Sequence, residues 1–127
     1  MPDALRPLRA LIVDDQRDML MTLGILLRSE GLTVRLGERG AEVSAAVESF
    51  HPDVVLLDID LGAESGFDVA EALHRRARPM PALILVSTQS ESDFADMISD
   101  SPALGFLPKI AFSATAIRTM IAGRDSR

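Results

Sequence analysis

Carboxylates follow two of the apolar runs of this 127-residue chain. Asp14 and Asp15 come directly after the run 10–13, and Asp58 comes directly after the run 54–57. Carboxylates that are brought together repel one another, which raises the cost of keeping all of them ionised, so such a cluster calls for a compensating cation. Oxygen ligands with open coordination positions suit Mg²⁺, and a carboxylate is also a nucleophile that forms aspartyl phosphates. If the fold gathers these residues, the chemistry they support is phosphoryl transfer to Asp58.

A hydroxyl and a lysine follow two later apolar runs. Ser87 and Thr88 come after the run 83–86, and Lys109 comes after the segment 104–108. A lysine supplies a compact positive charge for a phosphate oxygen, and a hydroxyl donates one further hydrogen bond. Positioning and charge neutralisation provide most of the catalysis in phosphoryl transfer. Lys109 and a hydroxyl therefore complete a site that the three carboxylates only begin.

The elements that must position these residues alternate along the chain. Short apolar runs, typical of strands buried on both faces, alternate with segments whose apolar residues have helical spacing. We expect five strands near 10–13, 32–36, 54–57, 83–86 and 104–107, and five helices near Met19–Leu27, Val43–Phe50, Phe67–Ala77, Glu91–Ser101 and Ala114–Ile121. This alternation predicts an α/β fold with a doubly wound parallel sheet, in which ligands bind beyond the carboxyl ends of the strands.

Composition narrows the class of protein. The chain is 47% hydrophobic and 25% charged, it has no cysteine, and its formal net charge is −6. These values favour one globular domain without disulfides, and the negative charge argues against direct binding to nucleic acid. No apolar run approaches the roughly 20 residues of a membrane span, and Met1–Arg6 lacks the apolar region of a signal peptide. We therefore expect a cytoplasmic protein with no membrane association.

Four short motifs, taken together in their order along the chain, resemble the receiver domain of two-component response regulators. The resemblance implies a flavodoxin-like (βα)5 fold with strand order 2-1-3-4-5, and it extends over a core from about residue 9 to residue 123. It implies one receiver domain over residues 1–127 without an output domain. The four motifs, each at the end of a predicted strand, are Leu11-Ile12-Val13-Asp14-Asp15, Val54-Val55-Leu56-Leu57-Asp58, Ser87 and Gly105-Phe106-Leu107-Pro108-Lys109, and Gly66 matches as well.

The resemblance assigns roles to the acidic residues. Asp58 corresponds to the phosphoacceptor of the family. Asp14 and Asp15 correspond to its acidic pair, with Asp15 as a direct ligand of Mg²⁺ and Asp14 acting directly or through water. The backbone carbonyl of Asp60 occupies the position of the third protein ligand. The side chain of Asp60 is a departure, because many members have a neutral residue there, and we expect its charge to alter the lifetime of the phosphoryl group.

Further roles follow for the residues after the last two strands. Ser87 corresponds to the hydroxyl that responds to phosphate, with Thr88 as the less well spaced alternative and an ordinary loop hydroxyl as the simpler interpretation. Lys109 corresponds to the lysine that contacts the phosphate. Phe106 corresponds to the aromatic switch residue, although an ordinary core residue is an equal interpretation. Ile110 follows Lys109 where the family usually has proline, so we expect a different loop shape there.

The function implied is a signalling switch and not a metabolic enzyme. A sensor histidine kinase or a histidine phosphotransfer protein would donate the phosphoryl group, and the chain would assist only its own phosphorylation and dephosphorylation. A downstream protein effector would read the result, with the chain as a monomer or a weak homodimer. Two alternatives stay open at this point. One is a receiver-like interaction module that works without phosphorylation, and the other is a haloacid-dehalogenase-type phosphatase with Asp58 as nucleophile and Asp60 as acid and base.

Several residues have structural interpretations. Asp18 stands near the start of the first predicted helix and is expected to cap it, since aspartate favours such positions. Met19 and Met21 are interpreted as packing residues and not as functional ones. His51 and His74 are isolated from the motifs, and we expect both at exposed helix ends without a metal.

Overall fold

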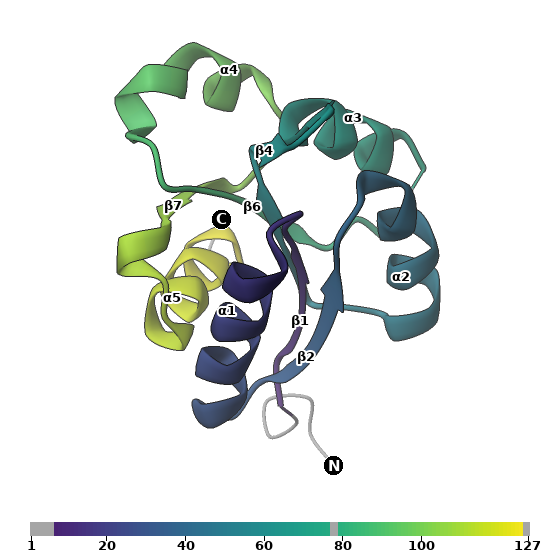
Figure 1. Cartoon of the computed structure of the whole chain (residues 1–127), viewed down its shortest axis with the longest axis vertical. Coiled ribbons are helices and arrows are strands. Elements are labelled where there is room, and N and C mark those ends of the chain that lie inside the picture. Colours follow the sequence, from purple (N-terminus) through teal and green to yellow (C-terminus); the bar gives the residue numbers. More distant parts are fainter. Residues whose placement is uncertain (1–6, 77–78, 126–127) are drawn as a thin grey trace.

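A parallel five-stranded sheet forms the centre of the computed structural model, which describes residues 7–76 and 79–125 (Figure 1). The strand order is β2-β1-β3-β6-β7, which is the predicted order 2-1-3-4-5 with two short extra strands counted between. The predicted doubly wound α/β fold is therefore confirmed. The five strands are β1 (Arg9–Val13), β2 (Thr33–Gly37), β3 (Val54–Asp58), β6 (Ala82–Ser87) and β7 (Gly105–Pro108).

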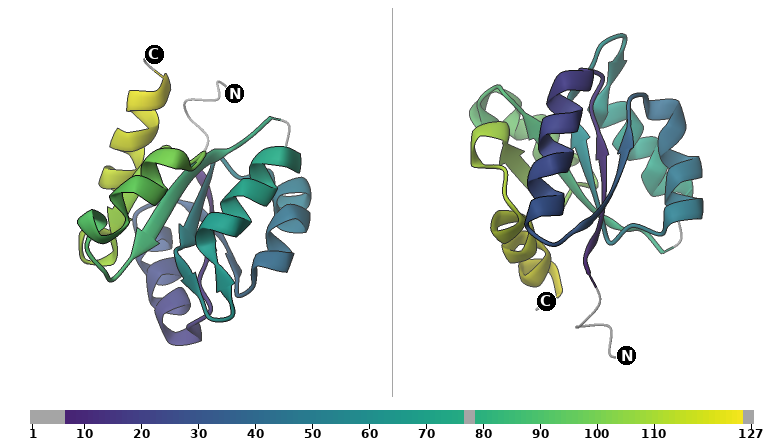
Figure 2. Two further views of the ribbon diagram at one scale, coloured as in Figure 1. Left: turned by 90° about the horizontal axis from the view of Figure 1, so that it is seen from above. Right: turned by 60° about the horizontal axis from the view of Figure 1, so that its bottom comes forward.

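Five α-helices cover both faces of this sheet. The helices α1 and α5 pack on one face, whereas α2, α3 and the segment around α4 pack on the other (Figures 1 and 2). The helices are α1 (Arg17–Ser29), α2 (Val43–Phe50), α3 (Gly66–Arg76), α4 (Ala95–Asp100) and α5 (Ala114–Asp125). Ala77, expected in the third helix, lies outside the described residues. Within the described residues, none of these helices has the length and apolar character needed to cross a membrane.

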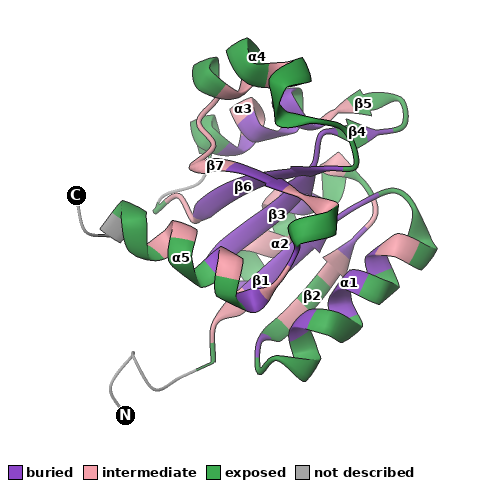
Figure 3. Cartoon of the chain, turned by 90° about the vertical axis from the view of Figure 1, so that its left-hand side faces the viewer, coloured by how far each residue is buried: buried purple, intermediate pink, exposed green. Residues whose placement is uncertain are grey.

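Burial of the inner strands divides the core into two layers. Successive side chains of a strand point to opposite faces, so Val54 and Leu56 pack toward α1 and α5 while Val55 and Leu57 pack toward α2 and α3. Every residue of β3 and β6 is buried, as Figure 3 shows for the middle of the sheet. This two-sided burial explains why both strands read as uninterrupted apolar runs in the sequence. It also fixes the register that brings the strand ends to one edge.

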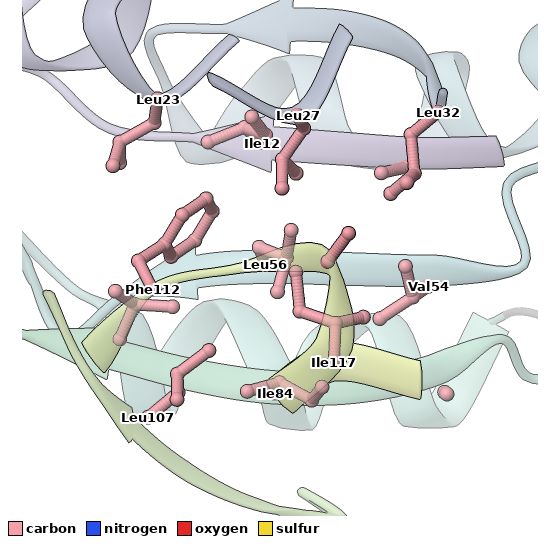
Figure 4. Packing of buried hydrophobic residues seen from close by; sticks show 14 of the residues in the cluster. Ile12, Leu23, Leu27, Leu32, Val54, Leu56, Ile84, Leu107, Phe112 and Ile117 are labelled. Atoms are coloured by element: carbon pink, nitrogen blue, oxygen red, sulfur yellow. The ribbon is translucent and has the colours of Figure 1, made fainter. Parts of the chain in front are cut away.

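The connection from β7 to α5 carries two neighbouring apolar residues with opposite environments. After a 3₁₀-helical turn at Lys109–Ala111, Phe112 inserts among Leu23, Ile12 and Leu56 and is only 6% exposed (Figure 4). Ile110 is 99% exposed. Phe112 therefore anchors the chain that follows Lys109, whereas Ile110 makes no comparable contribution to the core.

A small antiparallel hairpin follows β3 and was not predicted. Its strands are β4 (Asp60–Leu61) and β5 (Glu64–Ser65), and Gly62 in its turn has φ of +72°. Strands of two residues leave no alternating pattern in a sequence, which is why the hairpin could not be read from it. The hairpin stands at the edge of the sheet where Asp58 ends β3, so it borders the predicted site.

Three local predictions were wrong. Gln16, and not Asp18, occupies the cap position of α1, and Asp18 lies in the first turn, where its charge still suits the helix dipole. Met21 is 52% exposed and does not pack in the core, although Met19 does. The single helix expected over 91–101 is instead a 3₁₀ turn at Glu91–Phe94 followed by α4, because the backbone of Phe94 leaves the helical region (φ −126°, ψ 13°). His51 and His74 are exposed at helix ends, as expected.

Candidate functional site

Lys109 joins two buried carboxylates at the carboxyl edge of the sheet. Its Nζ donates to Oδ2 of Asp14 and to Oδ2 of Asp58, both at 2.8 Å. The side chains of the three residues are 9%, 1% and 9% exposed, respectively. Charged side chains are rarely buried so deeply unless they are paired. The structure therefore brings together three predicted site residues that end β1, β3 and β7.

Asp15 completes the predicted acidic group. Its side chain is exposed, but one carboxylate oxygen from each of Asp14, Asp15 and Asp58 lies within 4.8 Å of the others. Three hard oxygen donors at this spacing, one of them open to solvent, fit a divalent cation that keeps part of its water shell. The donor set is thus of the kind that suits Mg²⁺.

Three site residues share one local device. Oδ1 of Asp14, Oδ1 of Asp58 and Oγ of Ser87 each accept a hydrogen bond at 2.9 Å from the backbone N–H two residues later. Asp and Ser form such turns readily because their short side chains reach the following backbone. The turns lie at the ends of three parallel strands, at the same edge of the sheet, and each one ties its side chain to the backbone that follows. Pre-existing placement of this kind is what a positioning site requires.

Burial dominates the electrostatics of Asp58. Burial raises the pKa of its carboxyl above the ordinary value of 3.8, while the hydrogen bonds from Lys109 and from the Asp60 N–H oppose the rise. For Lys109, burial lowers the pKa, but the hydrogen bonds and charges of Asp14 and Asp58 outweigh it, and the pKa lies above the ordinary 10.5. Lys109 is therefore fully charged at neutral pH. The pocket holds more negative than positive charge, which favours a cation.

Ser87 and Thr88 differ sharply in environment. Ser87 ends β6 and is 5% exposed, whereas Thr88 is exposed. Asp58 pairs in register with Val86, so Ser87 lies one residue beyond the partner of Asp58. A hydroxyl that accepts one hydrogen bond can still donate another. These positions favour Ser87 over Thr88 as the hydroxyl of the site.

Phe106 lies in the core. It is 8% exposed and packs on the α2–α3 side of the sheet, in register with Leu85. Both interpretations of this residue remain compatible with its position, since a switch residue can be buried in one of its two states.

Asp60 and Gly66 flank the strand end that carries Asp58. Oδ1 of Asp60 accepts the Gly62 N–H at 3.1 Å, so its carboxylate is engaged within the hairpin. At Gly66, an added Cβ would overlap the backbone carbonyl of Asp58 and approach Cα of Ile59 to 2.8 Å. Only glycine allows α3 to begin so close to β3. This steric conflict explains why a glycine stands at position 66, which was among the matching residues in the sequence.

Reasoning from sequence missed three residues beside the site. Gly62 and Glu64 belong to the unpredicted hairpin, and no local pattern marks them. Phe112 could have been found, because it is an apolar residue between the end of β7 and the helical spacing of α5.

The match to a known family covers most of the chain. A family model described as response regulator receiver domain matches residues 10–122. Among curated relatives, Response regulator MprA of Mycolicibacterium vanbaalenii is 32% identical over 103 residues, which are 81% of this chain and 44% of that protein. The DNA-binding transcriptional regulator NtrC of Escherichia coli is 34% identical over 98 residues, 77% of this chain and 21% of that protein. The chain thus spans less than half the length of either relative.

Solved structures share the fold. A CheY-like receiver domain protein from Methanospirillum hungatei superposes with a TM-score of 0.78 at 23% identity, covering 94% of this chain and 95% of that one. Chemotaxis response regulator CheY4 of Vibrio cholerae gives a TM-score of 0.78 at 16% identity, covering 90% and 98%. At these identities the likeness concerns the fold alone.

Proposed function

The chain belongs to the response-regulator receiver domain family, a class of signalling modules, and from that premise we propose that Asp58 accepts a phosphoryl group from a phosphorylated histidine. The donor would be a sensor histidine kinase or a histidine phosphotransfer protein. One observation carries the proposal: the carboxylate of Asp58 lies at the end of β3 with Lys109 Nζ at 2.8 Å and two further carboxylates beside it. This arrangement has a nucleophile, a fixed positive charge and a cation-binding group at one point.

The transfer itself is a simple exchange. An oxygen of Asp58 forms a bond to phosphorus while the bond from phosphorus to the donor imidazole nitrogen breaks, and the imidazole takes up a proton. Lys109 would neutralise a phosphate oxygen, and Ser87 would donate a hydrogen bond to another. The chain supplies position and charge, which are the main contributions in phosphoryl transfer.

Mg²⁺ is the cofactor that the donor set favours. Asp15 and Asp58 would hold it directly, Asp14 would hold it directly or through water, and the backbone carbonyl of Asp60 would add a protein ligand. When bound, the ion neutralises negative charge on the transferring group. The excess of carboxylates over Lys109 in the pocket supports this assignment.

We propose that the signal leaves through protein–protein contact. A phosphoryl group adds nearly two negative charges, so Ser87 and Lys109 would move toward it and bias a two-state equilibrium. Phe106 on β7 would report this change at the surface formed by α4, β7 and α5. A downstream protein effector would bind there, with the chain as a monomer or a weak homodimer.

Small phosphodonor labelling tests the proposal. The chain is incubated with acetyl phosphate and Mg²⁺, and its intact mass is measured beside that of Asp58→Asn. The expected result is an adduct of one phosphoryl group that requires Mg²⁺ and is absent from the variant. An adduct that persists in Asp58→Asn would refute the role of Asp58.

The labelling assay and a phosphatase assay test the two alternative functions. A chain that gives no adduct with acetyl phosphate, phosphoramidate or a phosphorylated phosphotransfer protein is an interaction module independent of phosphorylation. Rapid turnover of a general phosphatase substrate, abolished in Asp60→Asn, would support the phosphatase alternative. The receiver match over residues 10–122 favours neither of these outcomes.

A further inference from the structure

We propose that Glu64 is a positioning residue of the cation site, which it supports by tethering the β4–β5 hairpin to the loop between β2 and α2. The proposal rests on the proposed magnesium site and adds to it a residue outside the acidic pocket. Glu64 would act through the hairpin on Asp15 and Asp60, and it would not contact the cation.

The hairpin forms one side of the acidic pocket. Its turn lies directly against Asp15, since a Cβ added at Gly62 would come within 2.9 Å of Oδ2 of Asp15. The same turn engages the side chain of Asp60, whose Oδ1 accepts the Gly62 N–H at 3.1 Å. The Asp60 N–H in turn donates to Oδ1 of Asp58 at 2.9 Å. A shift of the turn would therefore change the space available to Asp15 and would move the backbone of Asp60 at the same time.

Glu64 fixes the second strand of this hairpin from outside. Its Oε1 accepts the Gly40 N–H at 3.0 Å, across 24 residues of sequence. The approach is close on both sides, because a Cβ added at Gly40 would lie 2.7 Å from Oε2 of Glu64 and 2.5 Å from Cγ2 of Val69. Leu61, the partner of Glu64 in the hairpin register, is 5% exposed and holds the first strand in the core. The core thus anchors one strand, and the Glu64 carboxylate anchors the other.

The loop that receives Glu64 is itself attached to the start of α1. Arg17 pairs with Glu38 at 3.0 Å, and Oε1 of Glu42 accepts the N–H groups of Glu38 and Arg39. The Arg17 pair is exposed, so it contributes little energy by itself. Together with the Glu64–Gly40 bond, these contacts connect α1, the β2–α2 loop and the hairpin whose turn lies beside Asp15. Among these contacts, the bond of Glu64 is the one that joins the loop to the hairpin.

The proposed role of Glu64 does not depend on its charge or on contact with the cation. The contact requires an acceptor oxygen on a side chain of this length, which glutamine also provides. Groups that orient metal ligands change metal affinity when they are removed, although they do not touch the ion. The distinction between an acceptor and a charge gives the proposal a sharp test.

The test measures Mg²⁺ affinity by isothermal titration calorimetry in Glu64→Ala, Glu64→Gln and Glu48→Ala. Glu48 is an exposed acid on α2, and its removal takes away the same charge at a distance from the hairpin. We expect Glu64→Ala to raise the Kd for Mg²⁺ about tenfold, with Glu64→Gln and Glu48→Ala within about twofold of the unmodified chain. Gly62→Ala, which keeps Glu64 but crowds Asp15, should also weaken binding. Urea unfolding of each variant confirms that it is folded.

Labelling with acetyl phosphate gives a second readout. In Glu64→Ala the Mg²⁺ concentration for half-maximal labelling should rise, while the rate at saturating Mg²⁺ stays unchanged. Unchanged affinity in Glu64→Ala, or Glu64→Gln as weak as Glu64→Ala, would overturn the positioning role. A chain that binds Mg²⁺ but is never labelled refutes the proposed function and leaves the Glu64 comparison valid, whereas no Mg²⁺ binding at all refutes both.

Discussion

The ammonium nitrogen of Lys109 lies 2.8 Å from Oδ2 of Asp58, although the two residues are 51 positions apart in the chain. The contact exists because β3 and β7 end at the same edge of the sheet, on either side of β6. Asp14, which follows β1 on the far side of β3 from β7, accepts a hydrogen bond from the same ammonium. The ends of β1, β3 and β7 are therefore joined by the ammonium of Lys109, and an added phosphate would compete with Asp14 and Asp58 for this ammonium.

Removal of the Lys109 charge should destabilise the fold when Mg²⁺ is absent. Lys109→Met leaves Asp14 and Asp58 as buried carboxylates without a counter-charge, and we expect a loss of about 3 kcal/mol in the free energy of unfolding. Urea denaturation in a chelator measures it. Mg²⁺ should stabilise the variant more than the unmodified chain, because the ion replaces the missing charge. Arg118→Met on the exposed side of α5 is the control, and equal losses in the two variants would refute the expectation.

Asp58 should make stability depend on pH in a defined direction. Burial raises the pKa of Asp58 above 3.8 in the folded chain, so its favourable contribution is complete below that value and is lost as pH rises through the folded pKa. Asp58→Asn lacks this loss. Without Mg²⁺, its stability relative to the unmodified chain should therefore rise from pH 4 to pH 7. Urea unfolding at each pH checks this, and a difference that shrinks toward pH 7 would contradict it. Lys109 stays charged across this range and does not contribute.

The sequence predicted the sheet because its inner strands are buried on both faces. Every residue of the runs that end at Val13, Leu57 and Val86 is apolar and buried. The polar residue after each run marks the edge of the sheet. The site followed from the same signal, since parallel strands must place their ends together. Contacts between loops left no such trace. The Glu64–Gly40 bond joins a side chain to a backbone N–H, and a backbone donor has no sequence signature.

Substitution of Phe112 should lower the stability of the fold far more than substitution of Ile110. Phe112→Ala removes a ring that is 6% exposed, and we expect a loss of about 3–5 kcal/mol in the free energy of unfolding. Ile110→Ser changes a side chain that is 99% exposed, and stability should stay within about 0.5 kcal/mol. Thermal or urea unfolding of the two variants compares them directly. A large loss in Ile110→Ser would show that the loop after Lys109 packs differently.

Gly66 should tolerate no side chain. In Gly66→Ala the new Cβ would overlap the carbonyl of Asp58, so β3 and α3 must separate, and we expect a loss of about 1–3 kcal/mol. Labelling of Asp58 should fall as well, because the same displacement moves its backbone. Gly123→Ala in α5 is the matched control. A Cβ there meets no atom within 4 Å, and alanine favours helix by up to about 1 kcal/mol. Similar unfolding curves for the two variants would contradict the steric account.

Asp60 should shorten the lifetime of the phosphoryl group through its charge. Asp60→Asn keeps an oxygen that can accept the Gly62 N–H, so the hairpin should stay in place while one negative charge of the hairpin, two residues from Asp58 in the chain, disappears. A phosphoryl group adds negative charge at Asp58, and removing a negative charge near it should lengthen its lifetime by at most about fivefold. The decay of the phosphorylated mass after removal of acetyl phosphate measures it. Asp68 is an exposed acid in the first turn of α3, and Asp68→Asn should leave the decay rate unchanged. A decay rate in Asp60→Asn equal to that of the unmodified chain would show that the charge of Asp60 does not affect the lifetime.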